Sequence, residues 1–177
     1  MLAIDIDQVA LFGGKKPGIG GEVWMPGLVA RLQQEKLHHR VDVVQADFVE
    51  GKPAQRAAHL AVTSGSIQYS RNLQHSVRAI VASIQSFVRP RGYLYIDYML
   101  PMEQKHRERE NFFARGALHA LFPATEWHVL YDRVLPPLLE KAHVDNPVDH
   151  FHHWGHLLAR RQVSPARRPR SDRRGGP

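Results

Sequence analysis

Polar residues follow four apolar runs of this sequence, at the point where each run ends. Asp5 and Asp97 end two of the runs, and Asp47 and Ser64-Gly65-Ser66 follow the other two. Ligands bind a parallel sheet at the carboxyl ends of its strands, where a carboxylate can accept hydrogen bonds from ribose hydroxyls. Solvated loops also follow strands, so each segment alone has a simpler explanation. Their coincidence at successive strand ends favours a binding site.

A second group of residues whose side chains could take part in chemistry is a cluster of histidines near the C-terminus. Alternate residues of a strand share a face, so a strand here would place His150, His152 and His156 beside Trp154. Imidazoles bind metals, but no acid or cysteine completes a set of ligands in this pattern. We therefore expect a structural role or a polar pocket wall for these histidines, and no metal.

The glycine-rich stretch Phe12–Gly27 is expected to be a loop or an insertion. It contains six glycines and two prolines. Such loops can cradle phosphate, but Gly13-Gly14-Lys15-Lys16-Pro17-Gly18 matches neither the phosphate-loop pattern nor the dinucleotide fingerprint. The stretch also does not follow the first apolar run immediately. Phosphate binding at this stretch is therefore disfavoured.

The elements that would position the polar residues alternate between strand and helix. Residues 73–88 carry apolar side chains every three or four positions, which is typical of an amphipathic helix. Pro90 ends this helix, and Gly92 is expected to take the positive φ of the following turn. Strands joined through a helix pair in parallel. Parallel strands in one sheet are indicated for Leu2–Asp5, Val41–Ala46, His59–Thr63 and Tyr93–Tyr98.

The remaining elements complete one α/β domain. A short helix is indicated for Leu28–Leu37, and residues 103–122 are expected to form a helix whose apolar side packs on the sheet. Strands at Glu126–Tyr131 and Phe151–Arg160 follow without a helix between them, and the long segment between these two strands could form a flap over the site. The pattern predicts a doubly wound, mostly parallel sheet with an antiparallel C-terminal strand pair. The apolar residues expected to pack from the later helix are Phe112, Phe113, Leu118, Leu121 and Phe122.

Composition and charge limit the possible classes of protein. The 177 residues suffice for one domain, which we place at residues 1–161. The absence of cysteine excludes disulfides and suits a reducing cytoplasm, and no apolar run approaches the roughly 20 residues of a membrane-spanning helix. Residues 162–177 carry +4 of the formal net charge of +7, and we expect this Arg-rich tail to be disordered. Nucleic-acid binding by the tail is disfavoured because no aromatic residues are interleaved.

The order of these elements resembles that of class I S-adenosylmethionine-dependent methyltransferases over about residues 1–161. Ala46-Asp47-Phe48 resembles the motif in which an Asp contacts the adenine amino group. Ser64-Gly65-Ser66 resembles the loop after the fourth strand of that family, and Phe87–Ile96 resembles its helix end, proline-glycine turn and fifth strand. The C-terminal half, with Trp127-His128-Val129, is similar to small bacterial methyltransferases of the tellurite-resistance type.

The resemblance implies a Rossmann-like fold, S-adenosylmethionine as cofactor and methyl transfer to a small-molecule acceptor. The sulfonium of this cofactor is already activated, so methyl transfer needs positioning more than acid–base chemistry, and the sequence assigns no catalytic residue. The cofactor-binding residues that the resemblance implies are Asp5, Asp47, Phe48, Ser64 and Gly65. Candidates for the acceptor pocket are Tyr69, Tyr98, His152 and His153.

One departure from the family concerns its first strand and the Gly-rich loop after it, which would precede Met1 in this alignment. Three interpretations stay open: a misplaced gene start, a fragment, or a degenerate cofactor site in a non-catalytic binding or partner protein. A nucleotide-binding oxidoreductase domain is disfavoured because it also needs a fingerprint after its first strand, and because an antiparallel final pair suits the methyltransferase better. The acceptor atom and the oligomeric state stay open.

Overall fold

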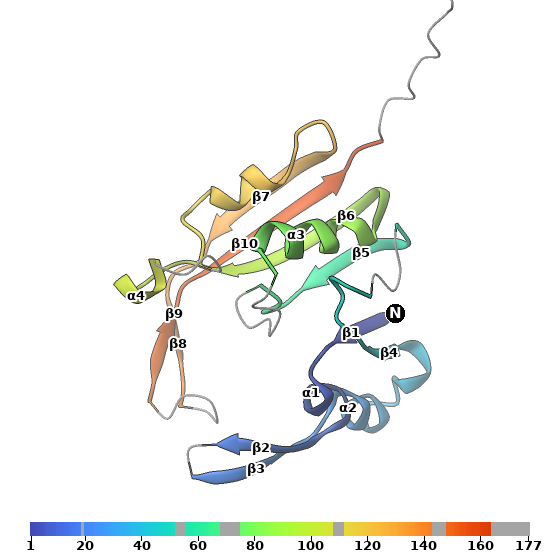
Figure 1. Cartoon of the computed structure of the whole chain (residues 1–177), viewed down its shortest axis with the longest axis vertical. Helices are drawn as coiled ribbons and strands as arrows, with labels where there is room; N and C mark the ends of the chain where they lie inside the picture. The colour runs from blue at the N-terminus through green and yellow to red at the C-terminus, as the bar shows by residue number, and fades with distance from the viewer. Residues whose placement is uncertain (19, 52–55, 68–74, 108–111, 143–147, 164–177) are drawn as a thin grey trace, which may run out of the picture.

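The centre of the molecule is a four-stranded sheet with the strand order β5-β6-β10-β7 (Figure 1). A computed structural model describes residues 1–18, 20–51, 56–67, 75–107, 112–142 and 148–163. β5 (Ala58–Thr63) runs parallel to β6 (Val88–Met99). β10 (Trp154–Arg161) is antiparallel to β6 and to β7 (Trp127–Val134). The predicted antiparallel C-terminal pair is therefore confirmed, and the chain has the predicted α/β fold.

A separate parallel sheet consists of β1 (Leu2–Asp5) and β4 (Asp42–Gln45). Figure 1 shows β1 running in the same general direction as β5 and β6. Within the described part of the chain, however, neither β1 nor β4 is hydrogen-bonded to β5. The expectation of one continuous parallel sheet is wrong at this position, because no described strand fills the space between β1 and β5.

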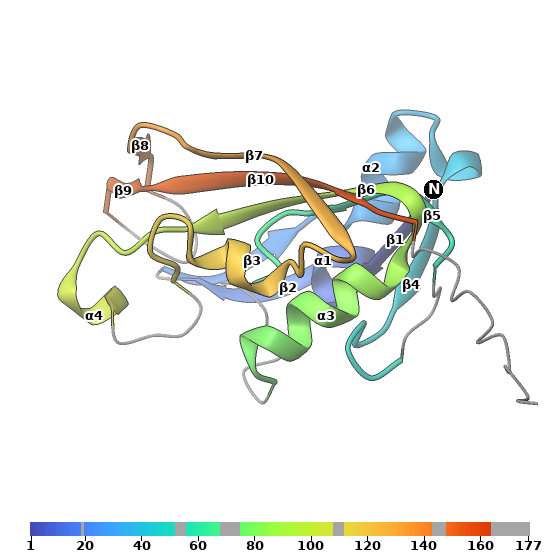
Figure 2. The ribbon, with the colours of Figure 1, turned by 90° about the horizontal axis from the view of Figure 1, so that it is seen from above.

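Helix α3 (Val77–Phe87) covers one face of the four-stranded sheet, together with the 3₁₀ helix η2 (Ala117–Leu121), as Figure 2 shows. The Ser76 side chain caps α3 by accepting a hydrogen bond from the Ala79 backbone N–H at 3.2 Å. The described part of the apolar stripe predicted for residues 73–88 is packed against the sheet, and residues 73 and 74 lie outside the described residues. The core contains Ile80, Val81 and Ile84 from α3, and Leu94, Ile96 and Leu157 from the strands.

The turn expected after α3 lies inside β6, because α3 ends at Phe87 and β6 begins at Val88. Arg91, with φ of 67°, takes the positive φ that was expected of Gly92. Gly92 is instead required by close packing, because a Cβ there would lie 2.8 Å from Val88 Cγ1 and 2.9 Å from the Ala58 carbonyl oxygen. The missing side chain thus allows the start of β6 to approach β5 closely.

The described part of residues 103–122 does not form the expected single helix. It contains the one-turn helix α4 (Gln104–Arg107) and η2, and Gly116 with φ of 77° precedes η2. The prediction of which residues pack on the sheet was more accurate than the prediction of a helix. Phe113, Leu118 and Phe122 are buried, and Leu121 packs against them. Apolar spacing alone therefore identified the buried residues but not the backbone conformation.

Two hairpins stand where loops were expected. The glycine-rich stretch forms an antiparallel hairpin after a short helix, and a second hairpin lies in the chain between β7 and β10, in the segment for which a flap was considered (Figure 1). None of the described helices is long and apolar enough to cross a membrane. Most of the Arg-rich tail, residues 164–177, lies outside the described residues. The remaining elements are α1 (Gln8–Phe12), β2 (Gly14–Gly18), β3 (Gly21–Met25), α2 (Leu28–Gln34), η1 (His38–Arg40), β8 (Leu138–Glu140) and β9 (His150–His152).

A buried contact between Tyr98 and Gly155 joins β6 to β10. The two residues are cross-strand partners, and the Tyr98 hydroxyl donates a hydrogen bond to the Asp132 carboxylate on β7. Burial and this carboxylate raise the pKa of Tyr98, so the hydroxyl stays protonated and remains a donor. The second oxygen of Asp132 lies 3.3 Å from His119 Nε2. The Tyr98 ring therefore has a fixed position over Gly155.

Gly155→Ala should strongly destabilise the protein, because the new Cβ would overlap the Tyr98 ring. Overpacking a core typically costs about 1–3 kcal/mol, and the fixed ring places this change at or above the upper end. We expect the midpoint of thermal unfolding to fall by about 6–12 °C. Gly20→Ala is the matched control, because nothing lies within 4 Å of its Cβ position. Equal unfolding midpoints for the two variants would contradict the proposed contact.

Candidate functional site

A groove lies between β1 and β5, and each of these strands has a partner on only one edge among the described residues. Its volume is about 680 Å³. An unpaired strand edge exposes a row of N–H and C=O groups, so the groove combines polar backbone edges with mostly apolar side chains. The side chains that line it include Leu2, Ile4, Phe48, Leu60, Val62, Thr63, Ser66, Ile84 and Phe87.

Thr63 ends β5 and is not among the site residues that the sequence implied. Its Oγ1 is buried and has no hydrogen-bond partner among the described residues. A buried polar group left without a partner costs about 1–3 kcal/mol. The hydroxyl lines the groove at the carboxyl end of β5, so a ligand or a further backbone segment in the groove could satisfy it.

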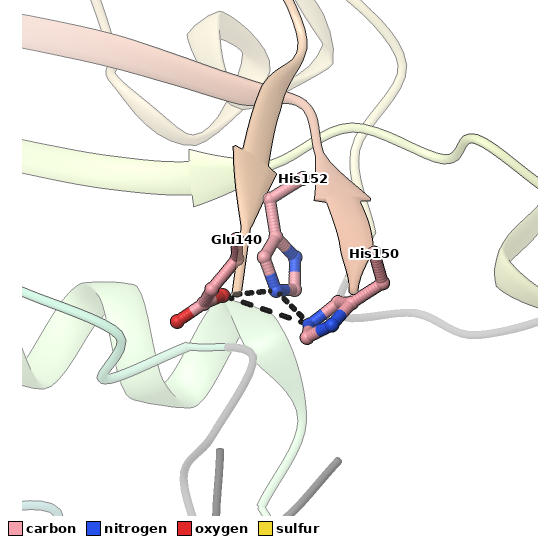
Figure 3. Close-up of side chains that lie close together, drawn as sticks. All are labelled: Glu140, His150 and His152. Carbon is pink, nitrogen blue, oxygen red and sulfur yellow. Dashed lines mark hydrogen bonds and ion pairs between the residues drawn. The ribbon is translucent and has the colours of Figure 1, made fainter. Parts of the chain in front are cut away.

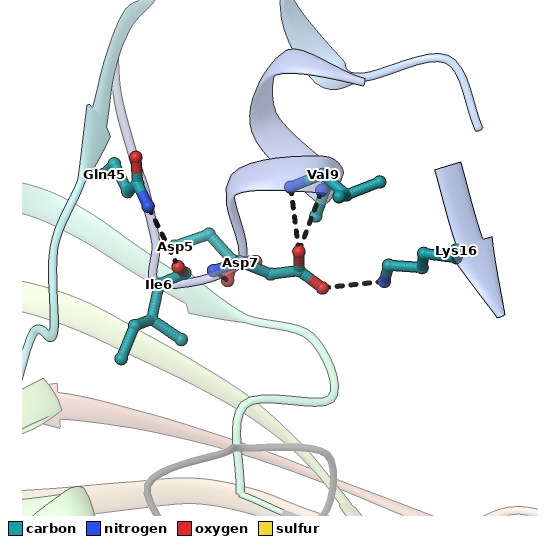
Figure 4. A network of polar contacts seen from close by, with 7 residues as sticks. Asp5, Ile6, Asp7, Val9, Lys16 and Gln45 are labelled. Carbon is teal, nitrogen blue, oxygen red and sulfur yellow. Dashed lines mark hydrogen bonds and ion pairs between the residues drawn. The ribbon is translucent and has the colours of Figure 1, made fainter. Parts of the chain in front are cut away.

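Asp5 lies at the carboxyl end of β1, where a short turn holds its carboxylate (Figure 4). The Asp7 backbone N–H donates to Asp5 Oδ1 at 2.8 Å. Asp7 in turn caps α1, with Oδ1 accepting from the Val9 and Ala10 amides, and its Oδ2 lies 2.7 Å from Lys16 Nζ. Asp7 and Lys16 are contacts that the sequence analysis missed, and they fix the loop that carries Asp5.

Asp47 follows β4 and is already engaged within the protein. Its Oδ1 accepts from the Val49 backbone N–H at 2.8 Å, and its Oδ2 lies 3.3 Å from His75 Nε2. Phe48 turns toward the core and the groove, and its carbonyl accepts a hydrogen bond from Ser83 Oγ at 2.7 Å. Asp47 therefore contacts both the backbone just after it and a side chain from the segment before α3.

Ser64 and Gly65 follow β5 and meet the end of β6. Gly65, with φ of 66°, donates its backbone N–H to Asp97 Oδ1 at 2.9 Å, while Ser64 is exposed. The carboxyl ends of β5 and β6 are therefore joined by a side-chain bond, as expected for strands that end at the same edge. Parallel pairing likewise places Asp5 beside the end of β4.

The three described candidates for the acceptor pocket, Tyr98, His152 and His153, differ in their surroundings. Tyr98 is fully buried in the core, and Tyr69 lies outside the described residues. The His153 carbonyl accepts a hydrogen bond from the Leu100 backbone N–H at 2.8 Å, which fixes the chain between β9 and β10. His152 lies on β9, where its Nε2 is 2.6 Å from Glu140 Oε2.

Glu140 overturns the premise that no acid accompanies the C-terminal histidines. It lies on β8 beside His150 and His152 (Figure 3). His156 does not join them, because its Nδ1 lies 2.6 Å from the Tyr95 hydroxyl on β6. The sequence pattern missed Glu140 because only the pairing of β8 with β9 brings it to the histidines.

The charge of Asp7 should stabilise the fold in a pH-dependent way. Burial alone would raise the pKa of the Asp7 carboxyl, but hydrogen bonds from Lys16 and from the Ala10 and Val9 amides hold this pKa below its usual value. The stabilisation is thus complete above the unfolded pKa, near 3.9, and is lost as pH falls through the lower folded pKa. Asp7→Ala should lower the free energy of unfolding by about 1–2 kcal/mol at pH 7.

Chemical denaturation at pH 7, 5 and 3 measures this effect. The difference in the free energy of unfolding between the wild type and Asp7→Ala should become smaller toward pH 3. Asp42→Ala, at an exposed position at the start of β4, should change the free energy of unfolding by less than about 0.5 kcal/mol. If the free energies of unfolding of the wild type and Asp7→Ala differ as much at pH 3 as at pH 7, the charge of Asp7 does not stabilise the start of α1.

No family model matches this sequence, and no curated protein matches it. Solved structures do. A 1,6-didemethyltoxoflavin-N1-methyltransferase from Burkholderia thailandensis, with bound 1,6-didemethyltoxoflavin and S-adenosylhomocysteine, has 16% identity and a TM-score of 0.57, over 92% of this chain and 61% of that one. TehB from Haemophilus influenzae has 14% identity and a TM-score of 0.57, over 91% of this chain and 49% of that one.

A S-adenosylmethionine-dependent methyltransferase from Methanosarcina mazei has 12% identity and a TM-score of 0.61, over 92% of this chain and 82% of that one. The chain thus spans less than two thirds of the length of the first two proteins. Identities this low bear on architecture, and the likeness extends over nearly all of this chain. The chain has the fold of class I S-adenosylmethionine-dependent methyltransferases.

Proposed function

We propose that this chain takes part in S-adenosylmethionine-dependent methyl transfer to a small-molecule acceptor. The observation that carries the proposal is the set of polar groups at the carboxyl ends of the parallel strands in a methyltransferase fold. Asp5 follows β1, Asp47 follows β4, and the Gly65–Asp97 hydrogen bond joins the ends of β5 and β6. This edge is where open α/β sheets bind ligands.

The residues present fit the nucleoside half of the cofactor. Asp5 is half-buried at a strand end and uses its Oδ1 for the Asp7 amide, so its Oδ2 would accept from a ribose hydroxyl. Asp47 would accept from the adenine amino group beside His75. The cofactor itself supplies an activated methyl group, so the protein has to bind, orient and exclude water. The methionine half would need contacts at the carboxyl end of β5, where Thr63 Oγ1 lacks a partner among the described residues.

We further propose that a parallel strand fills the groove between β1 and β5, supplied by polypeptide on the N-terminal side of Met1. β1 and β5 each have one edge without a described partner and border the same groove, and a strand placed there would pair with both edges. The first two similar structures contain segments beyond the matched region, since this chain spans 61% and 49% of their lengths.

The second face of the sheet supports the same proposal. Leu60 and Val62 on β5 are 55% and 61% exposed, and no described helix covers them as α3 covers the opposite face. A strand placed parallel to β1 needs a crossover connection of a dozen or more residues before it can enter β1, usually a helix. One strand–helix unit would therefore pair both edges and cover the exposed apolar residues.

A second candidate function is a non-catalytic binding or partner protein with a methyltransferase fold. The observation that favours it is the groove itself, because a cofactor site bordered by an unfilled groove lacks backbone contacts on one side. In this alternative, Asp5 and Asp47 serve the fold and not a cofactor. The two experiments below separate the alternatives.

The first experiment measures cofactor binding to residues 1–177. Titration of S-adenosylhomocysteine, followed by chemical-shift changes, should show weak binding that Asp5→Ala and Asp47→Ala weaken further. Each carboxylate offers a charge-assisted hydrogen bond, so each variant should lose about 10- to 100-fold in affinity. Asp42→Ala, an exposed Asp on β4, is the matched control and should bind as the wild type does. Unchanged affinity in both site variants would refute the assignment of the cofactor.

The second experiment compares residues 1–177 with the same chain extended by the in-frame codons upstream of Met1. The extended protein should bind S-adenosylhomocysteine much more tightly, and amide hydrogen exchange in β1 and β5 should slow because both strands gain a partner. Slower exchange without tighter binding would support the strand but favour the non-catalytic function. A closed upstream frame, or unchanged exchange in β1 and β5, would overturn the proposed strand.

A further inference from the structure

The hairpin of β8 and β9 brings two imidazoles and a carboxylate together on one face (Figure 3). Glu140 is the cross-strand partner of His150, and His152 lies two residues beyond His150. Residues at i and i+2 of a strand share a face, as do directly opposed cross-strand residues. All three side chains therefore project from the same side of the hairpin, and each points one donor atom at the other two.

The separations of these donor atoms suit a metal ion. His150 Nε2 lies 2.9 Å from His152 Nε2 and 3.6 Å from Glu140 Oε2. His152 Nε2 lies 2.6 Å from Glu140 Oε2. A tetrahedral site with bonds of about 2.0–2.2 Å holds neighbouring ligand atoms about 3.3–3.5 Å apart. Small side-chain rotations would bring the three atoms to these separations without any change in the backbone.

The second ring nitrogen of His150 sets the tautomer that a metal ligand needs. His150 Nδ1 lies 2.9 Å from the Val148 carbonyl oxygen. A carbonyl can only accept, so Nδ1 carries the proton and the Nε2 of the neutral ring presents a lone pair to the cluster. Metal-bound histidines in proteins almost always make such a bond through their other nitrogen.

His152 lies at the centre of the contacts within the cluster. His152 Nε2 faces both Glu140 Oε2 and His150 Nε2 but carries at most one proton, so it cannot donate fully to both. A divalent ion among the three atoms would bind all of them and would offset the charge of Glu140. The side chains of His150, His152 and Glu140 are 21%, 16% and 43% exposed, so the three donor atoms lie at a partly buried place.

The backbone around the cluster is braced independently of the three ligands. Asp149 Oδ2 lies 2.6 Å from Lys141 Nζ, and Asp149 Oδ1 accepts from the Ala142 backbone N–H at 2.9 Å. These contacts link the ends of β8 and β9 beyond the Glu140–His150 pair. The ligands are therefore positioned by the hairpin before any ion binds.

We propose that Glu140, His150 and His152 bind one divalent transition-metal ion of the Zn²⁺ type. Imidazole and carboxylate ligands suit Zn²⁺, whereas Mg²⁺ and Ca²⁺ prefer oxygen ligands throughout. Three protein ligands leave a fourth position for water or another small ligand. The proposal reverses the expectation from the sequence of no metal, and it does not depend on methyl transfer.

The test is a titration of residues 1–177 with Zn²⁺ alone against a chromogenic chelator, and with Co²⁺ followed by its visible absorption. The wild type should bind one ion, and Co²⁺ should give the intense spectrum of a four-coordinate site. Even outer-shell partners of metal ligands are worth about 10- to 100-fold in affinity, so His150→Ala, His152→Ala and Glu140→Gln should each cost about 100-fold or more. Zn²⁺ should raise the unfolding temperature of the wild type but not that of the three cluster variants.

His128→Ala is the matched control, because this exposed histidine lies on β7 outside the cluster, and it should bind Zn²⁺ within twofold of the wild type. Glu140→Gln keeps the size of the side chain, so its result decides the test if an alanine variant loses the fold of the hairpin. Equal Zn²⁺ affinity in Glu140→Gln and the wild type would overturn the site. Equal losses of Zn²⁺ affinity in His128→Ala and in the cluster variants would also overturn the site, because they would show that Zn²⁺ binds to many surface histidines.

Discussion

The pairing of β6 on both of its edges is the constraint on which the rest of the structure depends. β6 is hydrogen-bonded to β5 on one side and to β10 on the other, and Leu94, Ile96 and Tyr98 are fully buried. Buried backbone groups need partners, and β6 has them along most of its length. β1 and β5 have described partners on one edge only. Backbone pairing is thus most complete around β6. The candidate cofactor site lies beside β1 and β5, which each have one edge without a described partner.

Local periodicity in the sequence predicted the elements around β6 well, because burial on one face imposes a regular spacing on a helix or strand. The α3 stripe and the strand after it were found in this way. The same reasoning failed where non-local contacts decide. Nothing in the apolar runs shows that β1 and β5 are not paired, and the positive φ at Arg91 depends on how closely Gly92 must approach Val88 and Ala58.

The residues of the candidate site also fall into two groups, those that local sequence predicts and those that it does not. Strand-end carboxylates such as Asp5 and Asp47 could be predicted, because a polar residue after an apolar run has a position fixed by the strand itself. The residues that contact the predicted site residues could not be predicted. His75 reaches Asp47 from the segment before α3, and Glu140 meets His150 only through the register of β8 with β9. Such contacts join residues distant in sequence or on separate strands, and no local pattern encodes them.

The end of β6 connects the two candidate sites. Asp97 accepts the Gly65 amide at the carboxyl end of β5, and three residues later Leu100 donates its N–H to the His153 carbonyl between β9 and β10. Sites built on rigid elements hold their geometry better than sites on loops. Because β6 is buried and paired on both edges, it fixes the loop that borders the groove and the base of the β8–β9 hairpin relative to one strand. A displacement at either place would have to break hydrogen bonds at the end of this strand, so each site has a stable position within the fold even though their ligands differ in chemistry.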